Sequence, residues 1–129
     1  MPTQESGQHE DRTRVIGHLP LNNSAEEKAV KNIIDYVEAQ RRNRIGIEGY
    51  TYSAASAFYG RWWSSEARGW MEDKIILLIV DYKIPLTDKR FSLSEKVAEL
   101  QRVIHESYDR YGRPQEEVWV VAHPVIRHT

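Results

Sequence analysis

The stretch IILLIVDYKI, residues 75–84, decides the fold, because it is an aliphatic run that ends in a short polar segment. An unbroken Ile/Leu/Val run lacks the alternation of a half-exposed strand and indicates a strand that is buried on both faces. Pro85 follows directly and ends the strand, since proline has no N–H to donate to a sheet ladder. We therefore predict a central strand over residues 75–84.

The segment after this strand predicts a helix with signals at both ends. Ser92 with Glu95 three residues later forms a capping box, and Gly112 before Pro114 is a helix-stop signal. Between these signals, apolar residues recur at helical spacing and form one stripe. The stripe consists of Leu93, Val97, Leu100, Ile104, Tyr108 and Tyr111.

A second helix is predicted upstream of the central strand. Ser24 with Glu27 is another capping box, which places the start of this helix at residue 24. The apolar residues that follow share one helical face. They are Val30, Ile33, Ile34 and Val37.

Four other segments are candidates for strands. Residues 116–125 predict a final strand, in which Val118, Val120 and Ala122 face one way and Trp119, Val121 and His123 face the other. Residues 45–54 predict a strand weakened by glycine, and residues 56–64 either continue it past a bulge or form a further short strand. Residues 14–21 form either a short first strand or an extended lead-in.

These elements predict an α+β fold, a two-layer sandwich in which two helices cover one face of a sheet of four to five strands. With the first segment counted, the order is the ferredoxin-like (β)αββαβ. Without it, and with residues 56–64 counted, the order is αβββαβ, which resembles the common core of the PD-(D/E)xK nucleases. We predict one α+β domain over residues 13–129, preceded by a disordered polar tail over residues 1–12.

Composition narrows the classes of function. The net charge of −1 provides no basic field for nucleic acid. The absence of cysteine excludes disulfides, thiolate metal sites and a cysteine nucleophile, and it fits a cytoplasmic protein. No stretch is long and apolar enough to predict a membrane span, and no P-loop, dinucleotide-binding or hydrolase motif occurs. We therefore expect no cofactor, no membrane association and no nucleic-acid partner.

Asp81 and Lys83 are candidates for the site of a metal-dependent nuclease. They are two residues apart on a strand and so share a face, as such a site requires. A second carboxylate must also reach the metal ion. Glu48 is available for this role only if its strand neighbours the central strand in a favourable register.

The spacing of the histidines provides little evidence for a catalytic or metal site. None of them has HxxxH or HExxH spacing, so the sequence predicts no metal site. His9 and His128 fall in predicted tails. His123 shares a strand face with Trp119 and Val121, and it is a weak candidate for a general base.

Aromatic density is the most distinctive feature of the sequence, with seven aromatic residues between Tyr50 and Trp70. Trp62 and Trp63 are adjacent, and successive side chains of a strand point to opposite faces, so one of them lies outside the core. Exposed tryptophan beside tyrosine and arginine is typical of an interface or a ligand pocket. The predicted ligand or interface residues are Tyr50, Tyr52, Tyr59, Arg61, Trp62, Trp63, Trp70 and Trp119.

The sequence favours a small cytoplasmic binding or regulatory module that acts as a homodimer, because the second face of so apolar a sheet needs a cover. The aromatic segment also suits a further partner, either a protein or a small molecule. Two alternatives stay open. One is a ferredoxin-like small-molecule enzyme with an aromatic pocket, and the other is the nuclease with Asp81 and Lys83.

Overall fold

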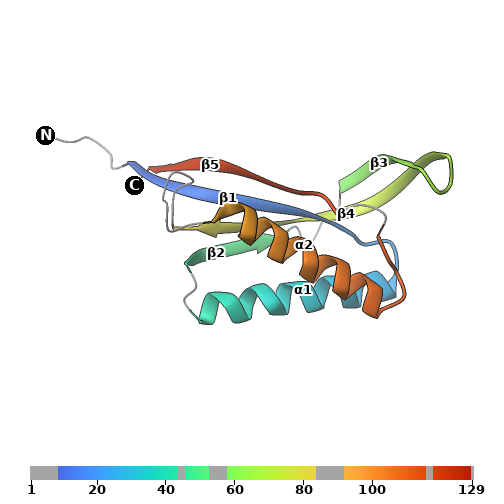
Figure 1. The fold of residues 1–129 in the computed structure, drawn as a ribbon, viewed down its shortest axis with the longest axis horizontal. Helices are drawn as coiled ribbons and strands as arrows, with labels where there is room; N and C mark the ends of the chain where they lie inside the picture. The colour runs from blue at the N-terminus through green and yellow to red at the C-terminus, as the bar shows by residue number, and fades with distance from the viewer. Residues whose placement is uncertain (1–8, 44–45, 53–57, 84–91, 116–117, 129) are drawn as a thin grey trace, which may run out of the picture.

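The computed structural model describes residues 9–43, 46–52, 58–83, 92–115 and 118–128. In these ranges the elements follow the order βαβββαβ (Figure 1). They are β1 (His9–Pro20), α1 (Ser24–Arg42), β2 (Ile47–Tyr52), β3 (Phe58–Ser64), β4 (Gly69–Tyr82), α2 (Leu93–Arg110) and β5 (Val120–His128). The uncertain first strand and the additional strand both exist, so each of the two predicted orders is incomplete by one strand.

The strands form one antiparallel sheet in the order β2-β4-β1-β5, with β3 paired to β4. Apart from β3, this is the ferredoxin-like arrangement, and the predicted fold class is confirmed. The prediction that residues 75–84 contain a central strand is also confirmed. β4 begins earlier than predicted, at Gly69, and ends at Tyr82.

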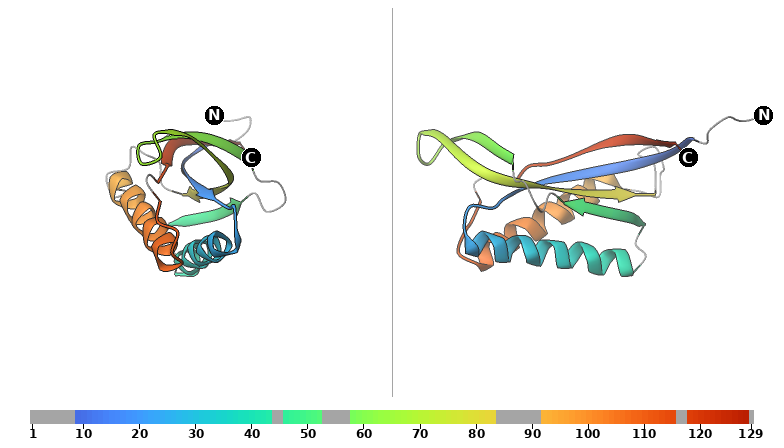
Figure 2. Two further views of the ribbon diagram at one scale, coloured as in Figure 1. Left: turned by 90° about the vertical axis from the view of Figure 1, so that its right-hand side faces the viewer. Right: turned by 180° about the vertical axis from the view of Figure 1, so that it is seen from behind.

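β3 extends one edge of the sheet. It pairs with the first half of β4, from Phe58 opposite Ile75 to Ser64 opposite Gly69. Ile75 also lies opposite Pro20 of β1, so β1 and β3 flank β4 on different sides. The register between β1 and β4 stops at this pair. The remainder of the β3–β4 hairpin is therefore a two-stranded ribbon, which projects beyond the helices (Figures 1 and 2).

Both helices lie on one face of the sheet (Figure 2). Alternate residues of the two central strands point toward them, because successive side chains of a strand face opposite ways. The buried core between the two layers consists of Val15, Leu19, Ala29, Val30, Ile33, Val37, Ile76, Leu78, Val80, Tyr82, Leu100, Val103, Ile104 and Tyr108. Most residues of the two predicted stripes therefore face the sheet, with Ile34 and Tyr111 packed at the edge of the core. Val97 is half-buried outside this core, and the side chain of Leu93 lies outside the described set.

The two helix starts differ from each other in how well the sequence predicts them. Ser92 is the N-cap of α2 and accepts a hydrogen bond from the Glu95 N–H, as predicted. At α1 the predicted cap is wrong by one residue. Asn23 is the N-cap, and its Oδ1 accepts from the Glu26 N–H at 2.9 Å. Asn caps a helix as well as Ser does, and the Glu26 carboxylate accepts from the N–H of Asn22, the residue before the cap.

Strand limits are the other corrections. β1 begins at His9, so residues 9–12 belong to a 12-residue central strand rather than to the predicted tail. β5 begins at Val120 and continues to His128, whereas the prediction ends at residue 125. His9 and His128 lie opposite each other on β1 and β5, so neither is in a tail. These strand ends are polar, and only the pairing of β1 with β5 reveals them.

Neither α1 nor α2, the two helices in the described part of the chain, is long and apolar enough to cross a membrane.

Candidate functional site

The face of the sheet without helices, here called the open face, carries the side chains that the fold leaves uncovered. Its residues fall into rows that cross the strands. In the central row, Ile16 of β1 lies between Ile79 of β4 and Val121 of β5. In the next row His18 lies opposite Leu77, and its N–H donates to the Trp119 carbonyl oxygen.

These two rows make an apolar patch. Trp119 is 47% exposed and Val121 is 42% exposed, while Ile16, Leu77 and Ile79 are half-buried. All five point away from the helices, because the opposite faces of β1 and β4 supply the core. The prediction that β4 is buried on both faces therefore holds for its helix side. On the other face Ile75 is buried, whereas Leu77 and Ile79 are half-buried and no described helix covers them.

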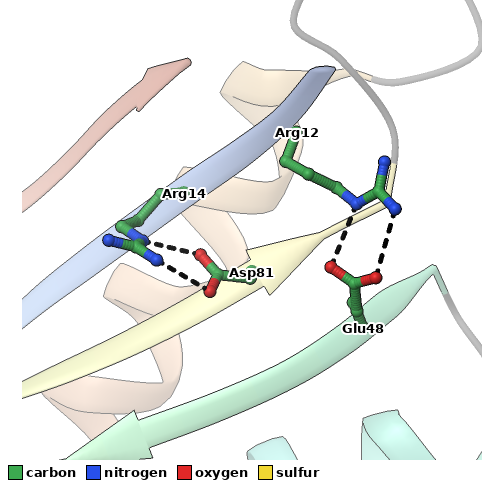
Figure 3. A network of polar contacts seen from close by, with 4 residues as sticks. All are labelled: Arg12, Arg14, Glu48 and Asp81. Atoms are coloured by element: carbon green, nitrogen blue, oxygen red, sulfur yellow. Dashed lines mark hydrogen bonds and ion pairs between the residues drawn. The ribbon is translucent and has the colours of Figure 1, made fainter. Parts of the chain in front are cut away.

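A charged cluster borders the apolar patch at one end of the sheet (Figure 3). Arg14 lies opposite Asp81, and its Nε and Nη2 donate to the two carboxylate oxygens at 2.7 and 3.1 Å. Arg12 makes the same two-pronged contact with Glu48 of β2, at 3.0 and 3.2 Å. The hydrogen bonds that Arg14 donates to Asp81 raise the pKa of Arg14. Each carboxylate thus has a matched guanidinium.

This cluster contains two of the residues on which the nuclease hypothesis depends, Glu48 and Asp81. β2 does neighbour β4, and Glu48 lies at the same end of the open face as Asp81, as that hypothesis requires. However, Arg12 and Arg14 occupy both carboxylates, and Lys83 is exposed at the end of the strand. Among the described side chains, no three His, Asp or Glu residues are grouped so that they could hold a metal ion. The geometry gives the nuclease no support.

His123 also lies on the open face, in the row of Arg14. It is exposed, and its Nδ1 is 3.1 Å from the carbonyl oxygen of Pro124, the next residue. His18 lies two rows away, with its Nδ1 3.3 Å from the Trp119 carbonyl oxygen. In each of these contacts the histidine ring meets a backbone carbonyl oxygen, and the contacts single out neither His18 nor His123 as a general base.

The β3–β4 hairpin carries the second uncovered surface. Trp63 lies opposite Trp70, and the two rings meet edge to face with their centroids 5.8 Å apart. They are 56% and 70% exposed. On the same side of the ribbon, Arg61 lies opposite Glu72 and forms an exposed ion pair with it. We call these four residues the hairpin surface.

The hairpin also answers part of the question raised by the adjacent tryptophans. Trp63 is exposed, as one of the two had to be. The side chains of Trp62 and Tyr59 lie outside the described set, although the backbone of β3 is described. The structure thus brings Arg61, Trp63 and Trp70 together, and it places Trp119 on the open face, away from them in the sheet.

The remaining predicted residues, Tyr50 and Tyr52, belong to neither surface. Tyr50 is half-buried on the helix side, and its hydroxyl donates to Glu38 of α1 at 2.9 Å. Glu38 also accepts from Arg41 and Arg42, and these bonds, with that of Arg41 the largest, lower the pKa of Glu38 to about 2. Tyr52 is 44% exposed at the end of β2. Tyr50 therefore fixes β2 to α1.

Sequence reasoning missed the centre of the open face. From the sequence, Ile16 and Ile79 are interpreted as core residues, because a run of apolar residues does not reveal which face of the strand a helix covers. One signal was present in β1, where Arg12, Arg14 and His18 alternate with Thr13 and Val15. That alternation predicts a strand with one uncovered face.

No protein-family model and no curated protein matches the sequence. Solved structures with a similar fold include a phage SAM lyase in complex with S-methyl-5′-thioadenosine, at 14% identity and a TM-score of 0.49, covering 95% of this chain and 88% of that one. Another is CutA1 from Oryza sativa, at 14% identity and a TM-score of 0.44, covering 90% and 81%. A third is the B. subtilis GlnK–ATP complex, at 9% identity and a TM-score of 0.42, covering 89% and 82%. Likenesses this distant concern the fold, and we draw no function from them.

Proposed function

We propose that the protein is a small binding module that acts as a homodimer, with the open face of the sheet at its interface. The observation that carries this proposal is the apolar patch of Ile16, Leu77, Ile79, Trp119 and Val121. An uncovered apolar patch of this kind, bordered by charged residues, is typical of a protein interface.

The composition of the patch supports self-association. Trp119 offers a large aromatic anchor, and aromatic anchors contribute most of the binding energy at many interfaces. The carboxylates of Glu48 and Asp81, which border the patch, are already paired with arginines of the same chain. Burying them at an interface therefore leaves neither carboxylate without a partner. A second copy of the same chain is the simplest cover for such a face.

The test introduces a charge into the central row of the patch. In Val121→Glu, association would bury an unpaired carboxylate, which is strongly unfavourable. We expect wild-type protein to sediment as a dimer at tens of micromolar and the variant to sediment as a folded monomer. Circular dichroism shows whether the variant has kept its fold.

Ile126→Glu is the matched control. Ile126 belongs to the same strand and is 56% exposed, but it lies on the other face of β5. This variant should remain a dimer. A wild-type monomer at tens of micromolar, or equal mass for the wild type and Val121→Glu, would contradict the proposed function.

A further inference from the structure

The open face and the hairpin surface lie on opposite sides of β4, the longest strand in the described part of the chain. On β4, Leu77 and Ile79 belong to the open face. Trp70 and Glu72 are an even number of residues from Leu78 and Val80, so they lie on the side of β4 that faces the helices. Trp63 pairs with Trp70 and shares its side. The helices do not reach the hairpin, so this side is uncovered there (Figures 1 and 2).

This sidedness limits what can cover both surfaces. If two copies packed open face against open face, the hairpin surface would stay exposed on the far side of each sheet. Edge-to-edge pairing through β5 would cover neither surface. In addition, β5 is an edge strand that contains Pro124, which has no N–H to donate to an added strand.

The areas also indicate that one surface alone is insufficient. The register of β1 with β4 spans eight residue pairs. At about 3.3 Å per residue, and with four strands about 4.8 Å apart, the open face measures roughly 500 Å². A stable specific interface buries about 800 Å² on each partner. Two tryptophans of about 250 Å² each, at the exposures of Trp63 and Trp70, supply about 300 Å² more.

We propose that the hairpin surface of one copy packs on the open face of another copy. In a homodimer the contact occurs twice, since each copy supplies one hairpin and one open face, and the contact is then symmetric. Trp63 and Trp70 provide the aromatic anchors, and the apolar patch around Ile16 and Ile79 receives them. This inference rests on the proposed function and specifies which surfaces of the two copies meet.

The test is complementation between two defective variants. Val121→Glu alters only the open face, and Trp70→Glu alters only the hairpin surface. We expect each variant alone to be a folded monomer in sedimentation experiments at tens of micromolar. In an equimolar mixture, the intact open face of the Trp70→Glu copy can receive the intact hairpin of the Val121→Glu copy. The mixture should therefore form a heterodimer. The experiment follows the mixture over a concentration series that extends to several hundred micromolar.

Trp63→Ala provides a second hairpin variant in case Trp70→Glu does not fold, and circular dichroism decides which of them is used. Recovery of dimer mass on mixing supports the inference. If the hairpin variants are dimers while Val121→Glu is a monomer, the inference is overturned in favour of packing between two open faces. The proposed function would then still stand. Two monomeric variants whose mixture stays monomeric would also overturn it. A monomeric wild type would overturn both the inference and the proposed function.

Discussion

Arg14 and Asp81 lie opposite each other on the two central strands, and their side chains form a two-pronged ion pair on the open face. The residues are 67 positions apart in the sequence. The pair gives Asp81 a partner that an isolated residue at the end of a strand lacks, and it changes what a substitution at Asp81 is expected to do.

Asp81→Asn should lower the free energy of unfolding by about 1 kcal/mol, because a two-pronged pair that is partly shielded from water is lost. The side chains of Arg14 and Asp81 are 35% and 29% exposed, so a larger effect is not expected. Urea unfolding of Asp81→Asn, Arg14→Gln and the double variant would measure the coupling between the two residues. Strictly additive effects would show that the pair contributes nothing.

Addition of Mg²⁺ or Mn²⁺ should leave the melting temperature of the wild type unchanged, because guanidinium groups occupy the carboxylates of Asp81 and Glu48. A ligand that binds only the native state raises apparent stability, so thermal melts detect such binding directly. A metal-dependent increase that disappears in Asp81→Asn would revive the nuclease hypothesis.

Asn23→Ala should cost about 1 kcal/mol of stability, because the Glu26 N–H loses its capping acceptor. Ser24→Ala should have little effect, since Ser24 is the first residue of α1 and is exposed. The two variants differ by one position and can be compared by chemical denaturation. The opposite order of effects would restore Ser24 as the cap.

Leu100→Ala should cost about 2–5 kcal/mol, since it leaves a cavity between α2 and the sheet. Leu100 is 5% exposed and belongs to the core cluster. Ser92→Ala, which removes the N-cap of the same helix, should cost about 1 kcal/mol. Small, equal losses in the two unfolding midpoints would mean that α2 does not pack as described.

Acid should destabilise the protein in part through Glu38. Its pKa is lowered from 4.5 to about 2 in the folded protein by Arg41 first, and then by Tyr50 and Arg42. Above pH 4.5 the carboxylate is ionised in both states and its stabilising contribution is complete. Between pH 4.5 and 2 the unfolded chain takes up the proton first, so the contribution is lost as the pH falls.

Glu38→Gln should therefore show a shallower loss of melting temperature than the wild type between pH 4.5 and 2. Thermal melts of both proteins over this range provide the comparison. Parallel curves would show that the contacts of Glu38 with Arg41, Arg42 and Tyr50 do not survive in solution.

Local patterns determined much of the architecture. The spacing of Val30, Ile33 and Val37 and the N-cap at Ser92 depend only on residues within a few helical turns, and the structure confirms both. The aliphatic run before Asp81 likewise identified a central strand. Its even-numbered residues from 76 to 80 face the helices, and its odd-numbered residues from 75 to 79 are buried or half-buried on the other face. In the predicted strand over residues 116–125, the period of two of strand geometry placed Trp119, Val121 and His123 on one face.

Only the tertiary structure decided which surfaces these residues form. Whether Ile79 is core or uncovered depends on which face the helices occupy, and no local pattern contains that information. The pairing of Arg14 with Asp81, and of Arg12 with Glu48, depends on the register among β1, β4 and β2. Trp63 and Trp70 are uncovered because β3 extends β4 beyond the last paired residue of β1. Register and layer order arise from contacts between distant segments, and for this reason the sequence pointed to an aromatic site without locating its two surfaces.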